Sequence, residues 1–435
     1  MRIFHSYLLI LFLFVTSCSK QDETERPVNP YRAEYNHILA ESLHFGAASN
    51  YSWFLHAEPS TDGESFYVSG ELDAAQATTS GSIGGNNSVL DYYESVLLKF
   101  DKNGNKLWET RPGFEFRTIL VVAPGVLTEK ENIVLIGADG NDQDLGRTRV
   151  MVFDDEGTFL FSHEEDNLYY HFGSIVDGIY GDAVRFLSVG HEYLLDGSVN
   201  PTIFDFQLTR NDISWKGKEI WTIDREGSTF TDIKKKGTNY FISSIDLDYN
   251  PETPAQRIYI SSYSPDFTSN WGYSIYRNGK ELEYAEIALS EDAVFLMAPT
   301  EDGDKEINSI NQHWFSTVIY AFELNGNERW ASKYYYTDYH DKGQKLLYHN
   351  NNLYLSGIVA GHQMNNGILG NAFISKIRPS NGDLIGNVKD FGDSTLLQSY
   401  YGMVFIGNNC WAVGETRNIQ ESAQAWMSKI PANKL

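Results

Sequence analysis

Residues 94–113 read ESVLLKFDKNGNKLWETRPG, and this stretch decides the fold. Apolar side chains in residues 96–100 alternate with the period of two that is typical of a β-strand. A second short run follows at residues 106–109, with Asn103 and Gly104 between the two. Because Asn-Gly tolerates positive φ, the stretch predicts a tight β-hairpin. Two strands alone bury too little apolar surface to be stable, so the fold depends on whether this hairpin recurs.

The hairpin pattern does recur. Three further clear copies, two weaker copies and one truncated copy are found, in that order, at residues 149–165, 317–335, 372–392, 203–227, 257–279 and 425–431. A short apolar strand precedes each copy, at residues 66–70, 133–137, 186–190, 240–244, 294–298, 353–357 and 411–414. The spacing from Gly137 to Gly190 is 53 residues, and from Gly357 to Gly414 it is 57. Such a period with four strands in each unit is typical of a β-propeller. The sequence therefore predicts an all-β, seven-bladed propeller with four-stranded antiparallel blades.

The last copy lacks its final strand, and a spare strand occurs near the start of the chain. Residues 37–46, HILAESLHFG, match residues 384–392, LIGNVKDFG, including the closing Phe-Gly. We predict that this N-terminal strand completes the last blade and removes an exposed sheet edge. The alternative is an unrelated leader strand. On this interpretation residues 34–435 form one propeller domain.

The first 18 residues form a targeting segment. Arg2 supplies a positive charge and residues 8–15 form an apolar stretch too short to span a bilayer, so residues 1–17 read as a signal peptide. The following Val-Thr-Ser-Cys resembles a bacterial lipobox, which implies that Cys18 is acylated. An ordinary secretory signal with a chance cysteine is the alternative.

Residues 18–33 are predicted to be a solvated tether, since they are polar and carry two prolines. Ser19 does not resemble an inner-membrane retention signal, so we expect the outer membrane, with the protein facing the cell surface. The second thiol, Cys410, lies in an apolar strand and reads as a buried hydrophobe.

The charge balance excludes one class of partner. The chain has 34 basic and 58 acidic residues, a net charge of −24 at pH 7. Such a chain repels nucleic acid, which we exclude as a partner.

Loop lengths indicate where a binding site lies. The connections between the second and third strands of several blades are long, notably residues 71–93, 299–314 and 359–370. Long loops in compact domains are often functional. Acidic residues in these loops, notably Asp139, Asp142 and Asp144, form the kind of oxygen-rich set that binds Ca²⁺, although none fits a twelve-residue calcium loop. Solvated acidic loops are the alternative, and we expect no other cofactor.

Aromatic residues gather on the same predicted face. Tyr169, Tyr170, Tyr335, Tyr339 and His340 are expected at the ends of outer strands, where the chain turns into the next sheet. Tyrosines there suit sugar rings or extended peptides, because they give contact area and a hydroxyl group at low entropy cost. The alternative is that they pack between blades. The candidate ligand- or partner-binding residues are Tyr92, Tyr93, Tyr169, Tyr170, Tyr249, Tyr335, Tyr339 and His340.

Catalytic motifs such as G-x-S-x-G or H-E-x-x-H are absent from the sequence. Residues 163–165 and 339–341 are the best polar clusters for a hidden site.

The hairpin pattern K-F-D-x-N-G-N followed by Trp, clearest at residues 99–108 and 322–330, resembles the repeat of bacterial PQQ-like (quinoprotein-type) β-propellers. That superfamily contains cofactor-dependent dehydrogenases and cofactor-free scaffolds. The dehydrogenases have regular Trp-docking motifs and a vicinal disulfide. Here Trp108, Trp221, Trp330 and Trp411 are irregularly placed and the cysteine pair is absent, so the resemblance implies the cofactor-free lipoprotein branch.

The sequence thus predicts a non-catalytic, lipid-anchored outer-membrane propeller that binds through its long-loop face. The expected partner is a transporter or lipoprotein complex resembling the starch-utilisation (Sus-like) type, or an oligosaccharide or peptide. The alternative is an enzyme that cleaves polysaccharides or peptides, with its site at the mouth of the central channel.

Overall fold

The computed structural model describes most of the chain from residue 29 onward. The described residues are 29–31, 35–37, 40–46, 51–74, 95–139, 147–165, 169–180, 183–193, 199–209, 212–220, 228–246, 255–278, 284–307, 310–337, 340–364, 367–391, 396–417 and 423–435. In these residues the regular structure is β-strand, apart from one short 3-10 helix at Ala432–Lys434.

The strands follow one another as antiparallel meanders of three or four. The first three meanders are β4 (Tyr51–Pro59), β5 (Ser65–Ala74), β6 (Ser95–Asp101) and β7 (Lys106–Thr110); β8 (Glu115–Val122), β9 (Asn132–Asp139), β10 (Arg147–Asp154) and β11 (Phe159–Glu165); and β12 (Tyr169–Tyr180), β13 (Ala183–Tyr193), β14 (Val199–Thr209) and β15 (Asp212–Ile220).

The remaining meanders complete the set. They are β16 (Ser228–Lys236), β17 (Asn239–Asp246), β18 (Ala255–Tyr263) and β19 (Ser269–Asn278); β20 (Glu286–Leu289), β21 (Ala293–Ile307), β22 (Ile310–Glu323) and β23 (Glu328–Tyr334); β24 (His340–His349), β25 (Asn352–Met364), β26 (Gly367–Ile377) and β27 (Val388–Phe391); and β28 (Leu397–Ile406), β29 (Asn409–Arg417) and β30 (Ala423–Pro431). The short apolar strands predicted ahead of each hairpin all fall in the second strand of a meander.

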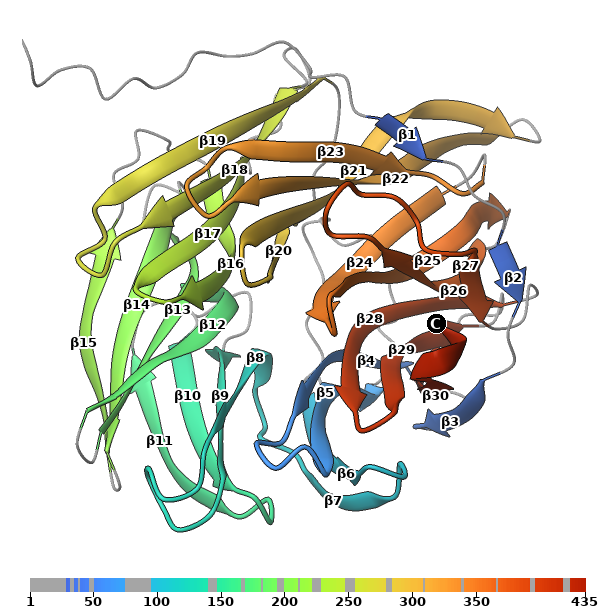
Figure 1. Ribbon diagram of the computed structural model, residues 1–435. Coiled ribbons are helices and arrows are strands. Elements are labelled where there is room, and N and C mark those ends of the chain that lie inside the picture. The colour runs from blue at the N-terminus through green and yellow to red at the C-terminus, as the bar shows by residue number, and fades with distance from the viewer. Residues whose placement is uncertain are drawn as a thin grey trace, which may run out of the picture.

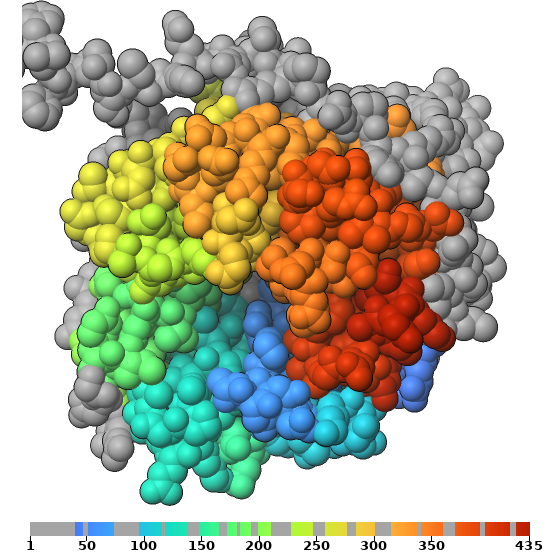
Figure 2. All heavy atoms as spheres, in the orientation of Figure 1, coloured from blue at the N-terminus to red at the C-terminus, as the bar shows by residue number. Residues whose placement is uncertain are grey.

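The sheets are arranged around a central axis. Figure 1 shows the first strand of each meander near the centre and the later strands farther out, and Figure 2 shows the same view hollowed at its centre. This radial arrangement of antiparallel sheets is that of a β-propeller. We call the face with the first-to-second and third-to-fourth turns, such as residues 60–64 and 102–105, the turn face. The opposite face, which carries the ends of β5 and β6 at Ala74 and Ser95, is the loop face.

The turns of the repeated hairpin are closed by an aspartate. Asp101 Oδ1 accepts hydrogen bonds from the backbone N–H groups of Asn103 (2.8 Å) and Asn105 (2.9 Å). Gly104 adopts φ of 91°, and its N–H donates to the Asp101 carbonyl oxygen at 3.0 Å. Gly104 alone takes the left-handed conformation in this turn, so the hairpin has a type I turn with a bulge rather than a two-residue turn.

Tryptophans on outer strands dock the sheets together. The Trp108 indole N–H donates to the carbonyl oxygen of Asp155 in the next sheet at 2.7 Å. A Cβ atom added to Gly157 in the same turn would lie 2.9 Å from the Trp108 ring. Trp271 with Leu324 and Gly326, and Trp330 with Pro379 and Gly382, repeat this arrangement.

The irregular tryptophan placement expected from the sequence is therefore wrong for Trp108 and Trp330. The regular spacing between the turn and the tryptophan includes Trp271. Trp271 follows Phe267 by four residues, just as Trp108 follows Gly104. Phe267 adopts φ of 60° where the other copies have glycine, and this substitution hides the repeat. Trp221 lies outside the described residues.

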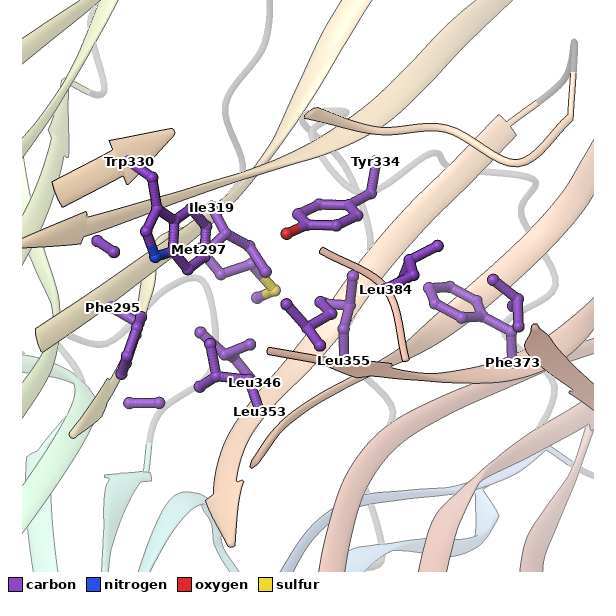
Figure 3. Close-up of a cluster of buried hydrophobic side chains, with 14 of the residues drawn as sticks. Phe295, Met297, Ile319, Trp330, Tyr334, Leu346, Leu353, Leu355, Phe373 and Leu384 are labelled. Atoms are coloured by element: carbon purple, nitrogen blue, oxygen red, sulfur yellow. The ribbon is translucent and has the colours of Figure 1, made fainter. Parts of the chain in front are cut away.

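The core is built from the layers between neighbouring sheets. Figure 3 shows one such layer, between the β20–β23 and β24–β27 sheets, where Phe295, Met297 and Trp330 face Leu353 and Leu355. These side chains are at most 8% exposed. Because each sheet buries apolar side chains on both faces, the sequence shows nearly continuous apolar runs in the second strands.

Three short strands precede the meanders. The strands β1 (Asn29–Tyr31) and β2 (Tyr35–His37) pair parallel with β23 and β27, and β3 (Glu41–Phe45) pairs antiparallel with β30. The chain therefore joins the sheets from Asn29 on, ahead of the boundary at residue 34 expected from the sequence.

Two predicted loops are strands instead. Residues 299–314 continue β21 and β22, which stay paired out to Ile307 and Ile310. Residues 359–370 likewise continue β25 and β26, paired out to Met364 and Gly367. The prediction of loops was wrong here because pairing with a partner strand, rather than alternation within one run, extends these hairpins on the loop face. The third predicted loop, residues 71–93, lies mostly outside the described residues.

Candidate functional site

Five charged side chains come together at the centre of the ring. Glu58 lies on β4, Asp232 and Lys234 on β16, Glu286 on β20 and Lys345 on β24. They interact electrostatically with one another, and their strands surround the axis in Figure 1. We call these five residues the axial cluster.

Four members of the axial cluster are paired. Lys345 donates a hydrogen bond to Glu286 Oε1, and the Leu346 N–H donates to Glu286 Oε2 at 2.7 Å. Lys234 lies 3.2 Å from Asp232 Oδ1. The other oxygen of Asp232 accepts the Ile287 N–H at 2.9 Å, which links β16 to β20. These contacts fix the positions of two carboxylates and two ammonium groups.

Glu58 is different. No side chain or backbone group of the described residues donates a hydrogen bond to its carboxylate, although Lys345 and Lys234 act on it electrostatically. Burial raises the pKa of Glu58 and also that of Glu286. For Lys345 burial alone would lower the pKa, but the carboxylates of Glu286 and Glu58 outweigh it, so the pKa is raised.

The axial cluster combines a carboxyl group of raised pKa with a charged ammonium group. Glu58 is a carboxyl group whose pKa is raised by burial and to which no described group donates a hydrogen bond. Beside it, Lys345 stays charged. The axial cluster can therefore accept a hydrogen bond from a ligand, or exchange a proton with it, in the centre of the ring.

A second polar group lies at the loop face. The Tyr401 hydroxyl donates to Glu415 Oε1 at 2.7 Å, and Arg417 donates to Glu415 Oε2 at 2.8 Å. The Arg417 guanidinium lies 5.9 Å from the centre of the Tyr51 ring, within cation–π range. Burial and the Glu415 carboxylate raise the pKa of Tyr401 well above its ordinary value. This group links the innermost strands β28 and β4 where they meet the loop face.

Many of the residues predicted from the sequence lie outside the described part of the chain. They are Cys18, Tyr92, Tyr93, Asp142, Asp144, Tyr249 and Tyr339. Asp139 is the last residue of β9, where it pairs with Arg147. In the described residues no group of three or more His, Cys, Asp or Glu side chains is placed to hold a metal ion.

Tyr169 and Tyr170 were expected at the end of an outer strand, and this placement is wrong. They begin β12, an innermost strand, and pair with Glu192 and His191. The connection from β11 is only three residues long, so the aromatic run belongs to the next sheet. His340 similarly begins β24, opposite Gly361.

Tyr335 lies between two structural tyrosines at the loop face. Tyr334 and Tyr336 are buried, and their hydroxyls bond to the Gly382 carbonyl and to Ser375, both at 2.6 Å. Tyr335 itself is half-buried. Packing between sheets is therefore the role of two of these three residues.

The two polar clusters predicted as hidden sites are structural where they are described. Asp341 accepts the N–H groups of Tyr336 and Thr337, each at 2.6 Å, and so closes the turn before β24. In the other cluster Glu164 pairs with Arg149 on the neighbouring strand at 2.8 Å.

The sequence did not predict the axial cluster. Its members belong to four different repeats, and each is one charged residue in an otherwise ordinary strand. Each member lies on the first strand of its repeat, and that shared position is the signal that could have identified the cluster. The hairpin pattern in the sequence does not define the bounds of these first strands.

Comparison with known proteins does not assign the chain to a family. No protein-family model and no curated protein matches the chain. Among solved structures it is similar to an apocarotenoid oxygenase from Synechocystis (8% identity, TM-score 0.47, covering 89% of this chain and 95% of that one). It is also similar to the β-propeller domain of the Trilobed protease from Pyrococcus furiosus (11%, 0.43, 87% and 96%) and to the WD40 domain of SCAP from fission yeast (9%, 0.38, 90% and 94%). All three TM-scores are below 0.5, so the fold assignment rests on the sheets of this chain.

No helix in the described residues is long and apolar enough to cross a membrane.

Proposed function

We propose that this protein is a non-catalytic, lipid-anchored β-propeller of the outer membrane that binds a partner through its loop face. The anchor is Cys18, acylated after removal of residues 1–17. This part of the proposal rests on the lipobox-like sequence at residues 15–18. We expect the anchored protein to face the cell surface.

We further infer that the sheets form seven blades in a closed ring. Supporting this, β28, β29 and β30 form a meander of three strands, and β3 pairs antiparallel with β30 from Glu41↔Lys429 to Phe45↔Ala425. The first strand of the next sheet, β4, also meets β30, at Tyr51↔Ala423. A ring completed in this way leaves no long open edge.

The repeat itself supports a relationship to PQQ-like propellers, and the lack of an adjacent cysteine pair in the sequence favours their cofactor-free branch. Three tryptophans, Trp108, Trp271 and Trp330, dock on the turn of the next sheet in the same way. The proposal needs no bound cofactor.

The observation that carries the binding proposal is the pair of extended hairpins on the loop face. The strands β21 and β22 have 15 and 14 residues, and β25 and β26 have 13 and 11, whereas β9 and β10 have eight each. These hairpins belong to neighbouring sheets, and β21, β22 and β25 are the longest strands in the described part of the chain. A protein partner could add a strand to these hairpins or pack against them. A nutrient transporter or a second lipoprotein of a Sus-like uptake complex is the expected partner, and an oligosaccharide or peptide is the expected cargo.

Photo-crosslinking tests the use of the loop face. A benzoylphenylalanine at Tyr335, on the loop face, should form an adduct with a second envelope protein in intact cells. The same residue at Asn103, on the turn face, is the control and should not. Adducts at Asn103 alone, or at neither site, would contradict the proposal.

A second candidate function is favoured by the axial cluster. Glu58 and Glu286 both have raised pKa values at the centre of the ring, and a pair of carboxyl groups is the equipment of many glycosidases. On this alternative the chain cleaves polysaccharides or peptides. Hydrolysis by the purified protein that is abolished in both E58Q and E286Q would support it, and activity that survives both changes would contradict it.

A further inference from the structure

The first described residues run along the outer rim of three consecutive sheets. Asn29 pairs with Ser332 of β23, Tyr35 with Val388 of β27, and Leu43 with Met427 of β30. Figure 1 shows these strands in dark blue outside the sheets that they join. The chain therefore reaches the ring at the outermost strand of the β20–β23 sheet.

The last of these strands is fixed by packing as well as by backbone pairing. The Phe45 ring lies 5.3 Å from the Phe54 ring and 5.5 Å from the Phe100 ring. Leu43 packs against the same apolar cluster. Residues 41–45 are therefore part of the folded ring.

The reach from the lipid anchor to the ring is limited. Ten residues, 19–28, separate Cys18 from Asn29. Even a fully extended chain covers at most about 3.6 Å per residue, so this connection spans no more than about 40 Å. A compact domain of this size is about 55 Å across. The anchor therefore cannot reach from β1 to the opposite rim.

We propose that one side of the rim of the ring lies against the bilayer, and this inference rests on the lipid anchor proposed above. The outer edges of the β20–β23 and β24–β27 sheets lie next to the phospholipid headgroups, and the β4–β7 and β8–β11 sheets point away. In Figure 1 β1 lies across the ring from β7 and β11. This orientation leaves both the loop face and the turn face open to partners.

Two equivalent turn positions allow a matched test. Asn325 and Asn103 each precede the glycine of the repeated hairpin and are exposed, but Asn325 lies in the β20–β23 sheet and Asn103 in the β4–β7 sheet. The native Cys410 is buried and will not react with a dye. The full-length lipidated N325C and N103C variants, labelled with a donor dye, are placed in phosphatidylcholine vesicles that carry an acceptor on the headgroup.

We expect energy transfer from position 325 to exceed that from position 103 by roughly threefold or more, since the two sites are separated by about a domain diameter. Equal transfer from both sites would mean that the ring lies flat on a face, and greater transfer from position 103 would mean the reverse orientation. Either result overturns the proposal.

Two controls separate the orientation from the anchor. Vesicle flotation tests the anchor itself: a wild-type protein that fails to float with the vesicles would overturn the anchor and the orientation with it. Flotation together with equal transfer would overturn the orientation alone. An insertion of about twenty Gly and Ser residues after residue 28 adds roughly 25 Å of reach and should reduce the difference between the two sites.

Discussion

Single charged residues determine how this ring responds to pH, and the axial Glu58 gives the clearest case. Burial raises the pKa of its carboxyl, helped by Glu286 and Asp232 and opposed by Lys345 and Lys234. When the folded pKa exceeds the unfolded one, the stabilisation is complete below the unfolded pKa and is lost as the pH rises through the folded pKa.

We therefore expect E58Q to unfold at a higher temperature than the wild type near pH 7, because glutamine removes the negative charge that this site disfavours. The two proteins should converge toward about pH 4, below the ordinary glutamate pKa. Thermal unfolding followed by circular dichroism across this range measures the difference. The exposed Glu64 pairs with Lys102 on the turn face, and E64Q, the control, should show no such trend. A lower melting temperature for E58Q at pH 7 would contradict the account.

The pKa of Asp177 shifts in the opposite direction from that of Glu58. Burial would raise its pKa, but hydrogen bonds from Lys235 and Tyr240 and the charge of Arg185 outweigh burial and lower it. Its Oδ1 lies 2.7 Å from Lys235 Nζ and its Oδ2 lies 2.9 Å from Arg185. The carboxylate thus joins the β12–β15 sheet to the β16–β19 sheet.

We expect D177N to lower the free energy of unfolding by about 3 kcal/mol near pH 7, because it removes the buried carboxylate that pairs with Lys235 and one of the two carboxylates that pair with Arg185. A lowered folded pKa gives stability that is present above the ordinary aspartate pKa and is lost as the pH falls through the folded value. The difference from the wild type should therefore shrink in acid. The control is D383N, since the exposed Asp383–Arg378 pair (3.2 Å) should contribute less than about 1 kcal/mol. Equal effects of the two changes in urea titrations would be incompatible with this account.

At the scale of elements, the contact between a tryptophan and a turn glycine holds neighbouring sheets in register. Gly382 and Gly386 lie near the same hairpin and adopt φ of 78° and 74°. A Cβ atom at Gly382 would lie 2.8 Å from the Trp330 ring, whereas one at Gly386 would meet nothing within 4 Å.

This pair separates backbone strain from docking. Alanine at either site costs about 1–2 kcal/mol for the left-handed conformation. We expect G382A to cost a further ~1–3 kcal/mol, because the Trp330 ring must move. Urea unfolding of both variants measures the difference, and intrinsic fluorescence should report a shifted Trp330 environment only in G382A. Equal costs would show that docking of Trp330 on the turn adds nothing to stability.

Strands and turns could be predicted from the sequence wherever they depend on residues close together in the chain. The alternation in residues 96–100 and the turn at Gly104 identified a hairpin, and its recurrence identified the all-β repeat. The sequence predicts loops at residues 299–314 and 359–370, and this prediction is wrong because their strand character comes from pairing across the hairpin. The tryptophan docking was missed because Phe267 stands at a position where glycine is the signal.

At the scale of the whole molecule, the site residues depend on how the sheets are arranged around the axis. Glu58, Asp232, Glu286 and Lys345 come from strands far apart in the sequence, and no spacing rule connects them. Only the radial arrangement of the sheets brings them together. The binding surface depends on the same arrangement, since it places the β21–β22 and β25–β26 hairpins side by side on the loop face.

The measurement that tests the central claim most directly is the co-isolation of partners from gently solubilised outer membranes. The full-length protein is compared with a variant in which Asn-Gly replaces residues 302–314, so that the paired residues Glu301 and Phe315 are joined by a two-residue turn. Leu107, exposed on β7, supplies the control variant L107A. We predict that a transporter or second lipoprotein co-purifies with the wild type and with L107A, and that the shortened variant, with an unchanged melting temperature, loses it. Recovery of the same partner with the shortened variant, or of a lone wild-type protein, would contradict the account.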